Sequence, residues 1–170
     1  TDAAESIRET LAASVDQSEQ RIDLVVVDAN SKDATAHVVQ QWMAAEERRF
    51  GSVSLVRTTG DDRQSHILNS IFDRSRTPYV AMVTAHCELS RESIFELRTT
   101  TDLTFAAIVR ASAGEGGALA NSKGSEPVVI SVEAWAGGGG FNDVSNPIAD
   151  LCQRVEEFGL ALRTVATPTE

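Results

Sequence analysis

The chain has 170 residues, 42% of them apolar and 24% charged, which is ordinary for one globular domain with its own core. Its net charge of −10 argues against wholesale binding to nucleic acid or to an anionic membrane. No apolar run approaches the roughly 18 residues of a membrane span, and the N-terminus lacks a signal pattern. We therefore expect a single soluble domain over residues 1–170, located in the cytoplasm.

The two cysteines, Cys87 and Cys152, lie far apart and have neither a CxxC pattern nor histidines beside them. A structural disulfide and a zinc site are therefore the less favoured interpretations. We expect two reduced, partly buried thiols.

Hydrophobic periodicity predicts alternating helices and strands along the chain. Apolar residues at helical spacing predict helices near residues 3–18, 34–50, 67–72, 90–97 and 147–159. Runs of β-branched residues predict strands at residues 22–28, 53–56, 79–83, 105–109, 128–132 and 160–165. This alternation implies right-handed crossovers and a mostly parallel sheet. Residues 113–126 are typical of a mobile loop, and the glycines at 137–140 allow close backbone approach to a partner.

The most informative segment is the run of apolar residues that ends at Asp28. Four consecutive apolar residues before it predict a strand buried on both faces, as in parallel sheets. Ligands of open α/β sheets bind outside the carboxyl ends of the strands, so Asp28 is placed to meet one. Asn30 and Ser31 follow at turn and helix-cap positions.

This segment, LVVVDANSKDAT, resembles the VVDDGSTDGT element of family 2 glycosyltransferases. Four other segments resemble elements of the family in the same order, at residues 63–71, 79–88, 139–143 and 150–154. The resemblance implies the GT-A fold, a three-layer α/β/α arrangement with a mostly parallel central sheet. The family's first strand has no counterpart in these residues, so a missing chain segment or a protein partner would complete the sheet.

The resemblance also implies a nucleotide-diphosphate sugar as donor and a carbohydrate acceptor. Asp28, with Asn30 beside it, would contact the nucleotide, and Arg63 would meet a phosphate unless it is an ordinary solvated loop arginine. Thr84 is the fourth residue that we expect to contact the nucleotide-diphosphate sugar.

At the metal motif the chain reads VTAHCE, which resembles the DxHCE of polypeptide N-acetylgalactosaminyltransferases. Thr84 replaces the leading Asp, and a hydroxyl is a poor ligand for a hard divalent cation. His86 and Glu88 remain the candidate ligands for Mn²⁺ or Mg²⁺. The alternative is that His86 is a polar residue at a strand end.

The family's catalytic acid pair falls on Pro147 and Ile148, which cannot accept a proton. Asp143 and Asp150 are the candidate replacements for the base. Asp150 has a structural alternative, as an acid favoured near a helix N-terminus.

Two functions follow from these residues. The first is a glycosyltransferase related to family 2 with a degraded active site, and the second is a non-catalytic relative that serves as a binding or assembly module. An unrelated doubly wound nucleotide-binding domain fits less well, because no GxGxxG follows a strand.

Overall fold

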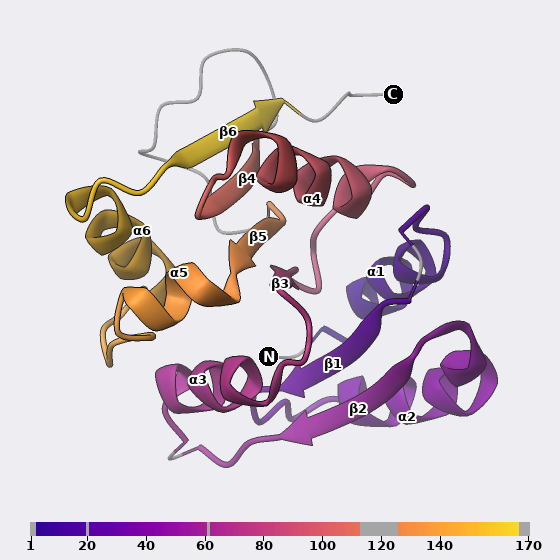
Figure 1. The fold of residues 1–170 in the computed structure, drawn as a ribbon. Helices are drawn as coiled ribbons and strands as arrows, with labels where there is room; N and C mark the ends of the chain where they lie inside the picture. The colour runs from indigo at the N-terminus through magenta and orange to yellow at the C-terminus, as the bar shows by residue number, and fades with distance from the viewer. Residues whose placement is uncertain (1–2, 20, 61, 113–125, 167–170) are drawn as a thin grey trace. The chain divides into compact units, whose positions relative to one another are not determined.

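The computed structural model describes residues 3–19, 21–60, 62–112 and 126–166 (Figure 1). Contacts between Cα atoms divide the chain into two units. Unit 1 contains Thr1–Asp61 and Thr84–Phe95, and unit 2 contains Asp62–Val83 and Glu96–Glu170. Each has its own sheet and core and is described by itself. That residues 1–170 form one domain stays a prediction.

Unit 1 is built on a parallel pair of strands. β1 (Asp23–Asp28) pairs with β2 (Ser52–Arg57) in a register that sets Asp28 opposite Arg57. The helices are α1 (Ser6–Val15), α2 (Thr35–Glu46) and the short 3₁₀ turn η1 (Glu47–Arg49). In Figure 1, α1 and α2 lie on the same side of the two strands. Their shared core with the strands contains Ile7, Leu11, Leu24, Val26, Val38, Val39 and Leu55.

The expectation that β1 is buried on both faces is wrong. Leu24 and Val26 are half-buried against α1 and α2, whereas Val25 and Val27 are 40% and 37% exposed. Successive side chains of a strand point to opposite faces, and the helices of unit 1 cover only one of them.

Unit 2 contains a four-stranded sheet with a mixed strand direction. Its order is β3 (Tyr79–Met82), β5 (Val128–Ser131), β4 (Ile108–Ser112) and β6 (Leu162–Ala166). β6 is parallel to β4, as expected, but β5 is antiparallel to both of its neighbours. The sequence predicts no helix between β4 and β5, and parallel pairing needs such a crossover.

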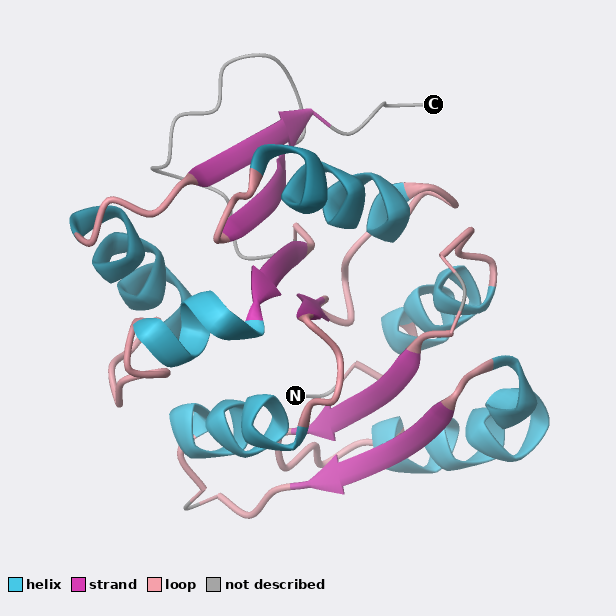
Figure 2. Cartoon of the chain, in the orientation of Figure 1, coloured by secondary structure: helices cyan, strands magenta, loops and turns pink. Residues whose placement is uncertain are grey.

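Helices cover both faces of this sheet (Figure 2). On one face, Leu97 of α4 (Ser93–Thr104) packs with Val109 and Val129. On the other face, α3 (Gln64–Arg74), α5 (Val132–Gly137) and α6 (Pro147–Glu157) pack through Phe72, Trp135 and Leu151. The predicted α/β class with three layers is therefore confirmed for unit 2.

Two boundaries differ from the expected ones. β4 begins at Ile108 rather than at Phe105, which has a left-handed φ of 51° and is 92% exposed. The helix α5, which the sequence did not predict, leads into the glycine run. It forms because the Ser131 side chain caps it by accepting a hydrogen bond from the Ala134 amide. The predicted loop at 113–126 lies outside the described residues except for Glu126.

Each sheet has two edge strands among the described residues, β1 and β2 in unit 1 and β3 and β6 in unit 2. Every open sheet has two such edges, so they do not test the expectation that the family's first strand is absent from these residues. The nature of the missing piece, a chain segment or a protein partner, stays a prediction.

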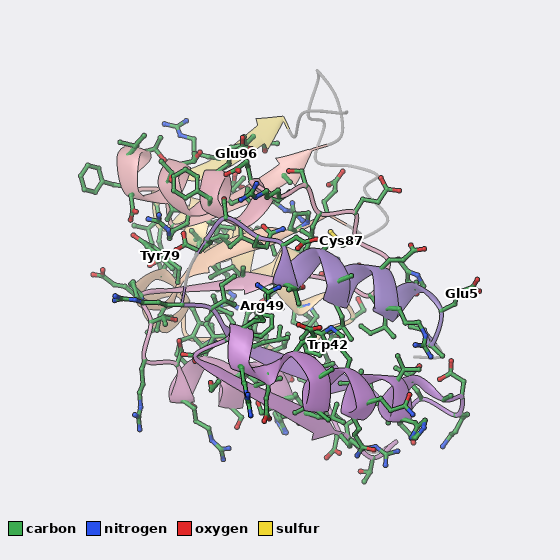
Figure 3. The ribbon with its side chains drawn as sticks, turned by 90° about the vertical axis from the view of Figure 1, so that its right-hand side faces the viewer. Glu5, Trp42, Arg49, Tyr79, Cys87 and Glu96 are labelled. Atoms are coloured by element: carbon green, nitrogen blue, oxygen red, sulfur yellow. The ribbon has the colours of Figure 1, made fainter. Side chains whose placement is uncertain are left out.

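Both cysteines lie outside any disulfide, and both are buried, whereas partly buried thiols were expected. Cys87 is labelled in Figure 3, and its carbonyl accepts a hydrogen bond from the hydroxyl of Thr10 on α1. Burial raises the pKa of the Cys152 thiol, and the nearby charge of Arg110 opposes this only in part.

The longest described helices, α2 and α4, contain 12 residues each. At about 1.5 Å per residue they are shorter than the hydrocarbon core of a bilayer, which is about 30 Å thick. No helix in the described part of the chain is long and apolar enough to cross a membrane.

Candidate functional site

Asp28 stands at the carboxyl end of β1 with only 1% of its side chain exposed. The Ser31 amide donates a hydrogen bond to Oδ1 at 3.0 Å, and Arg57 Nε donates to Oδ2 at 3.3 Å. Burial alone would raise the pKa of Asp28, but the hydrogen bonds from Ser31 and the charge of Arg57 lower it below its ordinary value. The carboxylate is therefore ionised at neutral pH.

Arg57 is the exposed member of this pair, with 61% of its side chain accessible to solvent. A carboxylate has about four acceptor positions, so the bonds from Ser31 and Arg57 leave capacity for a further donor.

The turn after Asp28 is held by its own residues. Asn30 has a left-handed φ of 60°, and its amide donates to the Asp28 carbonyl at 2.9 Å. Its side-chain oxygen accepts from Lys32 Nζ at 2.9 Å. Gly60 leaves room for the same side chain, since a Cβ there would lie 3.1 Å from Asn30 Nδ2. Asn30 is thus fixed beside Asp28, in the turn role that the sequence suggests.

The segment that resembles the metal motif also lies in unit 1. Thr84, His86 and Glu88 are all exposed, in a turn closed by a 3.1 Å hydrogen bond from the Cys87 amide to the Thr84 carbonyl. Thr10 of α1 anchors the turn by donating to the Ala85 carbonyl at 3.0 Å.

The donor chemistry of this turn is poor for a hard divalent cation. A neutral hydroxyl, one imidazole and one carboxylate supply a single charged ligand, whereas Mg²⁺ and Mn²⁺ favour several oxygens. The described residues contain no group of three His, Cys, Asp or Glu side chains that would hold a metal ion. These residues therefore do not fit a metal ion held by the protein alone.

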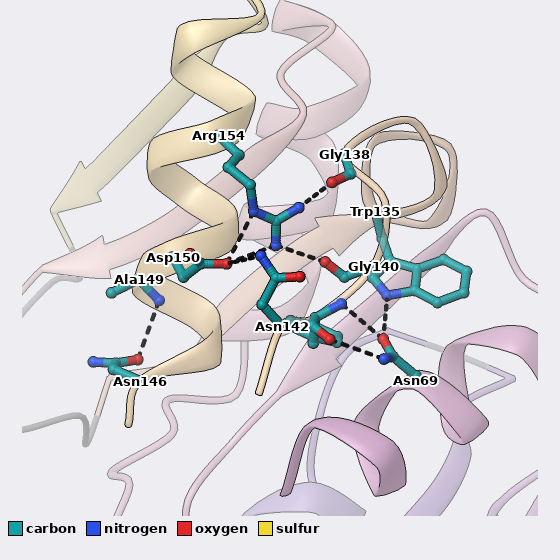
Figure 4. Close-up of polar contacts among 10 residues, drawn as sticks. Asn69, Trp135, Gly138, Gly140, Asn142, Asn146, Ala149, Asp150 and Arg154 are labelled. Carbon is teal, nitrogen blue, oxygen red and sulfur yellow. Dashed lines mark hydrogen bonds and ion pairs between the residues drawn. The ribbon is translucent and has the colours of Figure 1, made fainter. Parts of the chain in front are cut away.

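In unit 2, Asn69 of α3 holds the backbone of the residue after the glycine run (Figure 4). Its Oδ1 accepts from the Phe141 amide at 2.7 Å and from Trp135 Nε1 at 3.1 Å. Its Nδ2 donates to the Phe141 carbonyl at 3.0 Å. One side chain thus satisfies both backbone groups of Phe141.

Arg154 of α6 holds the glycine run from the other side (Figure 4). Its Nη2 donates to the Gly140 carbonyl at 2.7 Å, and its Nη1 donates to the Gly138 carbonyl. Asp150 orients this guanidinium by accepting from Nε at 2.9 Å and from Nη2 at 2.7 Å. We call Asn69, Asp150 and Arg154 the glycine clamp.

The clamp fits only glycine at one position. Gly140 has a φ of 77°, and a Cβ there would lie 2.9 Å from Asn69 Oδ1. Trp135 is 9% exposed, and its ring lies 5.3 Å from that of Phe72. Trp135 is therefore a packing residue in the core of unit 2.

The two candidate bases differ in how much of their hydrogen-bonding capacity is used. Asp150 Oδ2 accepts from Arg154 and also from Asn142 Nδ2 at 3.1 Å. Asp143 is 50% exposed and forms an ion pair with Arg63. The structure thus engages Asp150 in the clamp and leaves Asp143 at the surface.

Comparison with known proteins places these residues in a family. The sequence model described as Glycosyl transferase family 2 matches residues 2–116, which is more than half of the chain. The chain belongs to this family. A search of curated proteins finds no match.

Solved glycosyltransferase structures share the fold of this family 2 chain. The mannosyltransferase PcManGT from Pyrobaculum calidifontis, in complex with GDP-Man and Mn²⁺, superposes with a TM-score of 0.81 and 19% identity over 96% of this chain. S. aureus TarS 1-349 superposes with a TM-score of 0.70 and 14% identity over 99% of this chain. Its complex with UDP-GlcNAc superposes with a TM-score of 0.68 and 12% identity over 100% of this chain. The GT-A fold expected from the sequence is thereby confirmed.

The family 2 chain spans about half the length of these proteins. It covers 51% of the mannosyltransferase and 56% of TarS 1-349. At these identities the likeness shows the fold alone.

The predicted site residues of the family 2 chain fall in both units. Unit 1 holds Asp28, Asn30, Thr84, His86 and Glu88, and unit 2 holds Arg63, Asp143 and Asp150. The structure brings Asn30 next to Asp28 and joins Arg63 to Asp143.

Sequence reasoning missed the roles of three residues. Arg57 lay just after the strand predicted at 53–56 and had no role, although its register with Asp28 is a usable signal once the strands are paired. Asn69 and Arg154 belong to segments that resemble family elements, but no sequence pattern shows that they hold Phe141 and the glycine run.

Proposed function

We propose that this family 2 chain binds the nucleotide of a nucleotide-diphosphate sugar through Asp28 and that its catalytic site is degraded. The observation that carries the proposal is the buried, ionised Asp28 carboxylate at the carboxyl end of β1. The donor class is supported by the solved neighbours, whose structures contain GDP-Man, UDP or UDP-GlcNAc. A cytoplasmic location remains part of this proposal.

The chemistry of Asp28 suits a nucleobase. Uracil and guanine both present ring N–H groups, and a carboxylate accepts these in charge-assisted hydrogen bonds. The Ser31 amide fixes the orientation of the acceptor, while the exposed Arg57 is the partner that a base would displace. Asn30, held beside Asp28, supplies an amide for a ribose hydroxyl.

We propose Arg63 as the residue that holds phosphate. It directly precedes α3, and its own side chain does not cap that helix. A helix N-terminus and a guanidinium both favour an oxyanion.

The absence of the family's base and metal ligands at their expected positions supports the proposal that the catalytic site is degraded. Asn146 caps α6 by accepting from the Ala149 amide at 3.1 Å, and Pro147 occupies the first turn of that helix. The position of the family's base is therefore a helix start without a titratable side chain. The weak donor set of Thr84, His86 and Glu88 gives no ready site for Mn²⁺ or Mg²⁺, so no step is assigned to a metal.

Sugar transfer is the second candidate function, and the exposure of Asp143 favours it. In this reaction Asp143 would take the proton of an acceptor hydroxyl as its oxygen attacks the anomeric carbon. The bond from that carbon to the nucleotide diphosphate would break, and the diphosphate would leave with the electron pair. A non-catalytic binding or assembly module would show nucleotide binding or partner binding without this turnover.

Calorimetric titration with UDP-sugars and GDP-sugars, with and without Mn²⁺, tests the proposal. We expect nucleotide binding that does not require Mn²⁺ and no release of UDP or GDP over hours. Binding that needs Mn²⁺ and disappears in His86→Ala would instead assign His86 to a working metal site. Absence of binding to every nucleotide would remove the donor-binding function and leave the assembly module.

A further inference from the structure

Asp28 and Arg57 end two neighbouring strands of unit 1 and lie directly opposite each other. β1 and β2 are parallel, and their register pairs these two residues. The Asp28 carbonyl accepts hydrogen bonds from the Thr58 amide at 3.0 Å and from the Asn30 amide at 2.9 Å. These bonds tie together the backbone that follows each strand. Both side chains therefore start from a fixed edge of the sheet.

The two side chains meet at this edge as an acceptor beside a donor. The ionised Asp28 carboxylate is 1% exposed, and Arg57 Nε donates to its Oδ2 at 3.3 Å. A guanidinium carries five N–H donors in one plane, and 61% of the Arg57 side chain is accessible to solvent. The bond from Nε uses one of these donors, so the guanidinium retains others for a ligand that binds to Asp28.

This arrangement matches one edge of two nucleobases. Uracil and guanine each present a ring N–H next to a carbonyl oxygen, which is a donor beside an acceptor. Cytosine and adenine present an unprotonated ring nitrogen at the same place, with an amino group beside it. That nitrogen would oppose the Asp28 carboxylate as acceptor against acceptor, and an amino group on the Arg57 side would oppose donor with donor.

We infer that Arg57 is a specificity residue of the nucleotide site: Asp28 accepts the ring N–H of the base while the Arg57 guanidinium donates to the carbonyl oxygen beside it. The inference rests on the proposed function, because it concerns how a base is read at Asp28. The ring N–H takes the place of Arg57 Nε on Oδ2, and the guanidinium moves from the carboxylate to the carbonyl. The ligand class is a nucleotide of uracil or guanine rather than of cytosine or adenine.

The competing account is that Arg57 only neutralises the charge of the buried carboxylate. In that case its removal would change the affinity for every base alike. A hydrogen bond from the guanidinium to the base depends instead on the acceptor atom that the base presents. The decisive ligands are therefore those that differ in this atom alone.

Calorimetric titration of the full chain with UDP, CDP, GDP and ADP tests the base class. The four ligands share the ribose and the diphosphate and differ only in the base. We expect UDP or GDP to bind at least about tenfold more tightly than CDP and ADP, because a mismatched buried acceptor is costly. Asp28→Asn offers an amide N–H to the ring nitrogen of cytosine, so the preference should shrink or reverse. Binding of all four nucleotides within about twofold would overturn the inference.

Sulfur analogues of UDP test the role of Arg57 itself. The 2-thio and 4-thio analogues each replace one carbonyl oxygen beside the ring N–H with sulfur, a weaker acceptor. The analogue whose sulfur faces Arg57 should bind the wild type about fivefold more weakly than UDP does. Arg57→Met lacks the donor and should bind this analogue and UDP equally. If guanine is the preferred base, the 6-thio analogue of GDP is the equivalent probe.

Arg49→Met is the matched control. Arg49 is 65% exposed and belongs to η1, which precedes β2, so this variant removes the same charge from the other end of that strand. It should keep the difference of about fivefold between the natural nucleotide and its sulfur analogue. The same difference in Arg57→Met would assign the carbonyl to another donor, and its absence in the wild type would show that no donor reads this atom. Either result would contradict the role of Arg57.

The inference and the proposed function fail in different ways. If UDP or GDP binds the wild type without base preference or without a sulfur effect, Arg57 reads no carbonyl while the donor-binding function stands. If none of the four nucleotides binds the wild type, the donor-binding function itself fails, and the role of Arg57 fails with it.

Discussion

The Asp28 corner of unit 1 and the glycine clamp of unit 2 each pair a carboxylate with an arginine, but the arginines differ. Arg154 in the clamp is 19% exposed and also donates to the carbonyls of Gly138 and Gly140. Arg57 beside Asp28 is 61% exposed, and its guanidinium pairs with Asp28. A pair whose arginine also donates to backbone carbonyls holds the backbone in place, whereas a pair with an exposed arginine is able to exchange that arginine for a ligand.

Among the variants that test this contrast, Asn69→Ala is expected to lose the most stability. The change leaves the amide and carbonyl of Phe141 and the indole N–H of Trp135 without their partner. The free energy of unfolding should fall by about 3 kcal/mol, measured by urea denaturation. Ser70→Ala, an exposed position on the same helix, should change it by less than about 0.5 kcal/mol. A loss below about 1 kcal/mol in Asn69→Ala would show that the clamp does not stabilise unit 2.

The second effect compares two glycines of the same run. Gly140→Ala forces a side chain into a left-handed backbone against Asn69 and should cost about 2 kcal/mol. Gly137→Ala meets nothing within 4 Å and lies in the last turn of α5, so it should be neutral or stabilise by up to about 1 kcal/mol. Thermal unfolding of both variants checks the difference, and equal losses would contradict the tight fit at Gly140.

The third effect tests the ionised state of Asp28. Its pKa is lowered in the folded chain, so folding favours the carboxylate. The resulting stability is present above the unfolded pKa of about 3.9 and is lost as the pH falls through the folded pKa. The difference in unfolding free energy between the wild type and Asp28→Asn should therefore be constant from about pH 5 to 7 and shrink below about pH 4. Urea denaturation at each pH measures it, and a difference that grows on acidification would contradict the lowered pKa.

The smallest effect is expected from Arg57→Gln. Because Arg57 is mostly exposed, the free energy of unfolding should fall by less than about 1 kcal/mol. Arg154→Gln should cost clearly more, since it removes the guanidinium donor of two carbonyls and the charge partner of Asp150. Similar losses in the two variants, measured by urea denaturation, would remove the contrast between the two regions.

The sequence predicted those features that depend on local pattern. The valine-rich run located β1 and its terminal Asp28, and helical spacing located α3 and α6 within a few residues. These features rest on periodicity and on strand-end geometry, which a single segment contains.

The features that the sequence missed depend on contacts between distant segments. The exposure of Val25 and Val27 depends on which face the helices cover, and the direction of β5 depends on its neighbours in the sheet. The Asn69 bonds join residues that are 72 positions apart in the chain. No local preference specifies such a pairing, although the Asn69 element was recognised as a family resemblance.

The most direct test of the central claim is the dissociation constant of UDP and of GDP for the wild type, Asp28→Asn and Asp23→Asn. Asp23 lies at the amino end of the same strand, so its variant controls for the loss of one charge from β1. We expect Asp28→Asn to bind the preferred nucleotide at least about tenfold more weakly and Asp23→Asn to bind it like the wild type. Equal binding by all three proteins, or no binding of either nucleotide by the wild type, would contradict the assignment of Asp28 to the nucleotide.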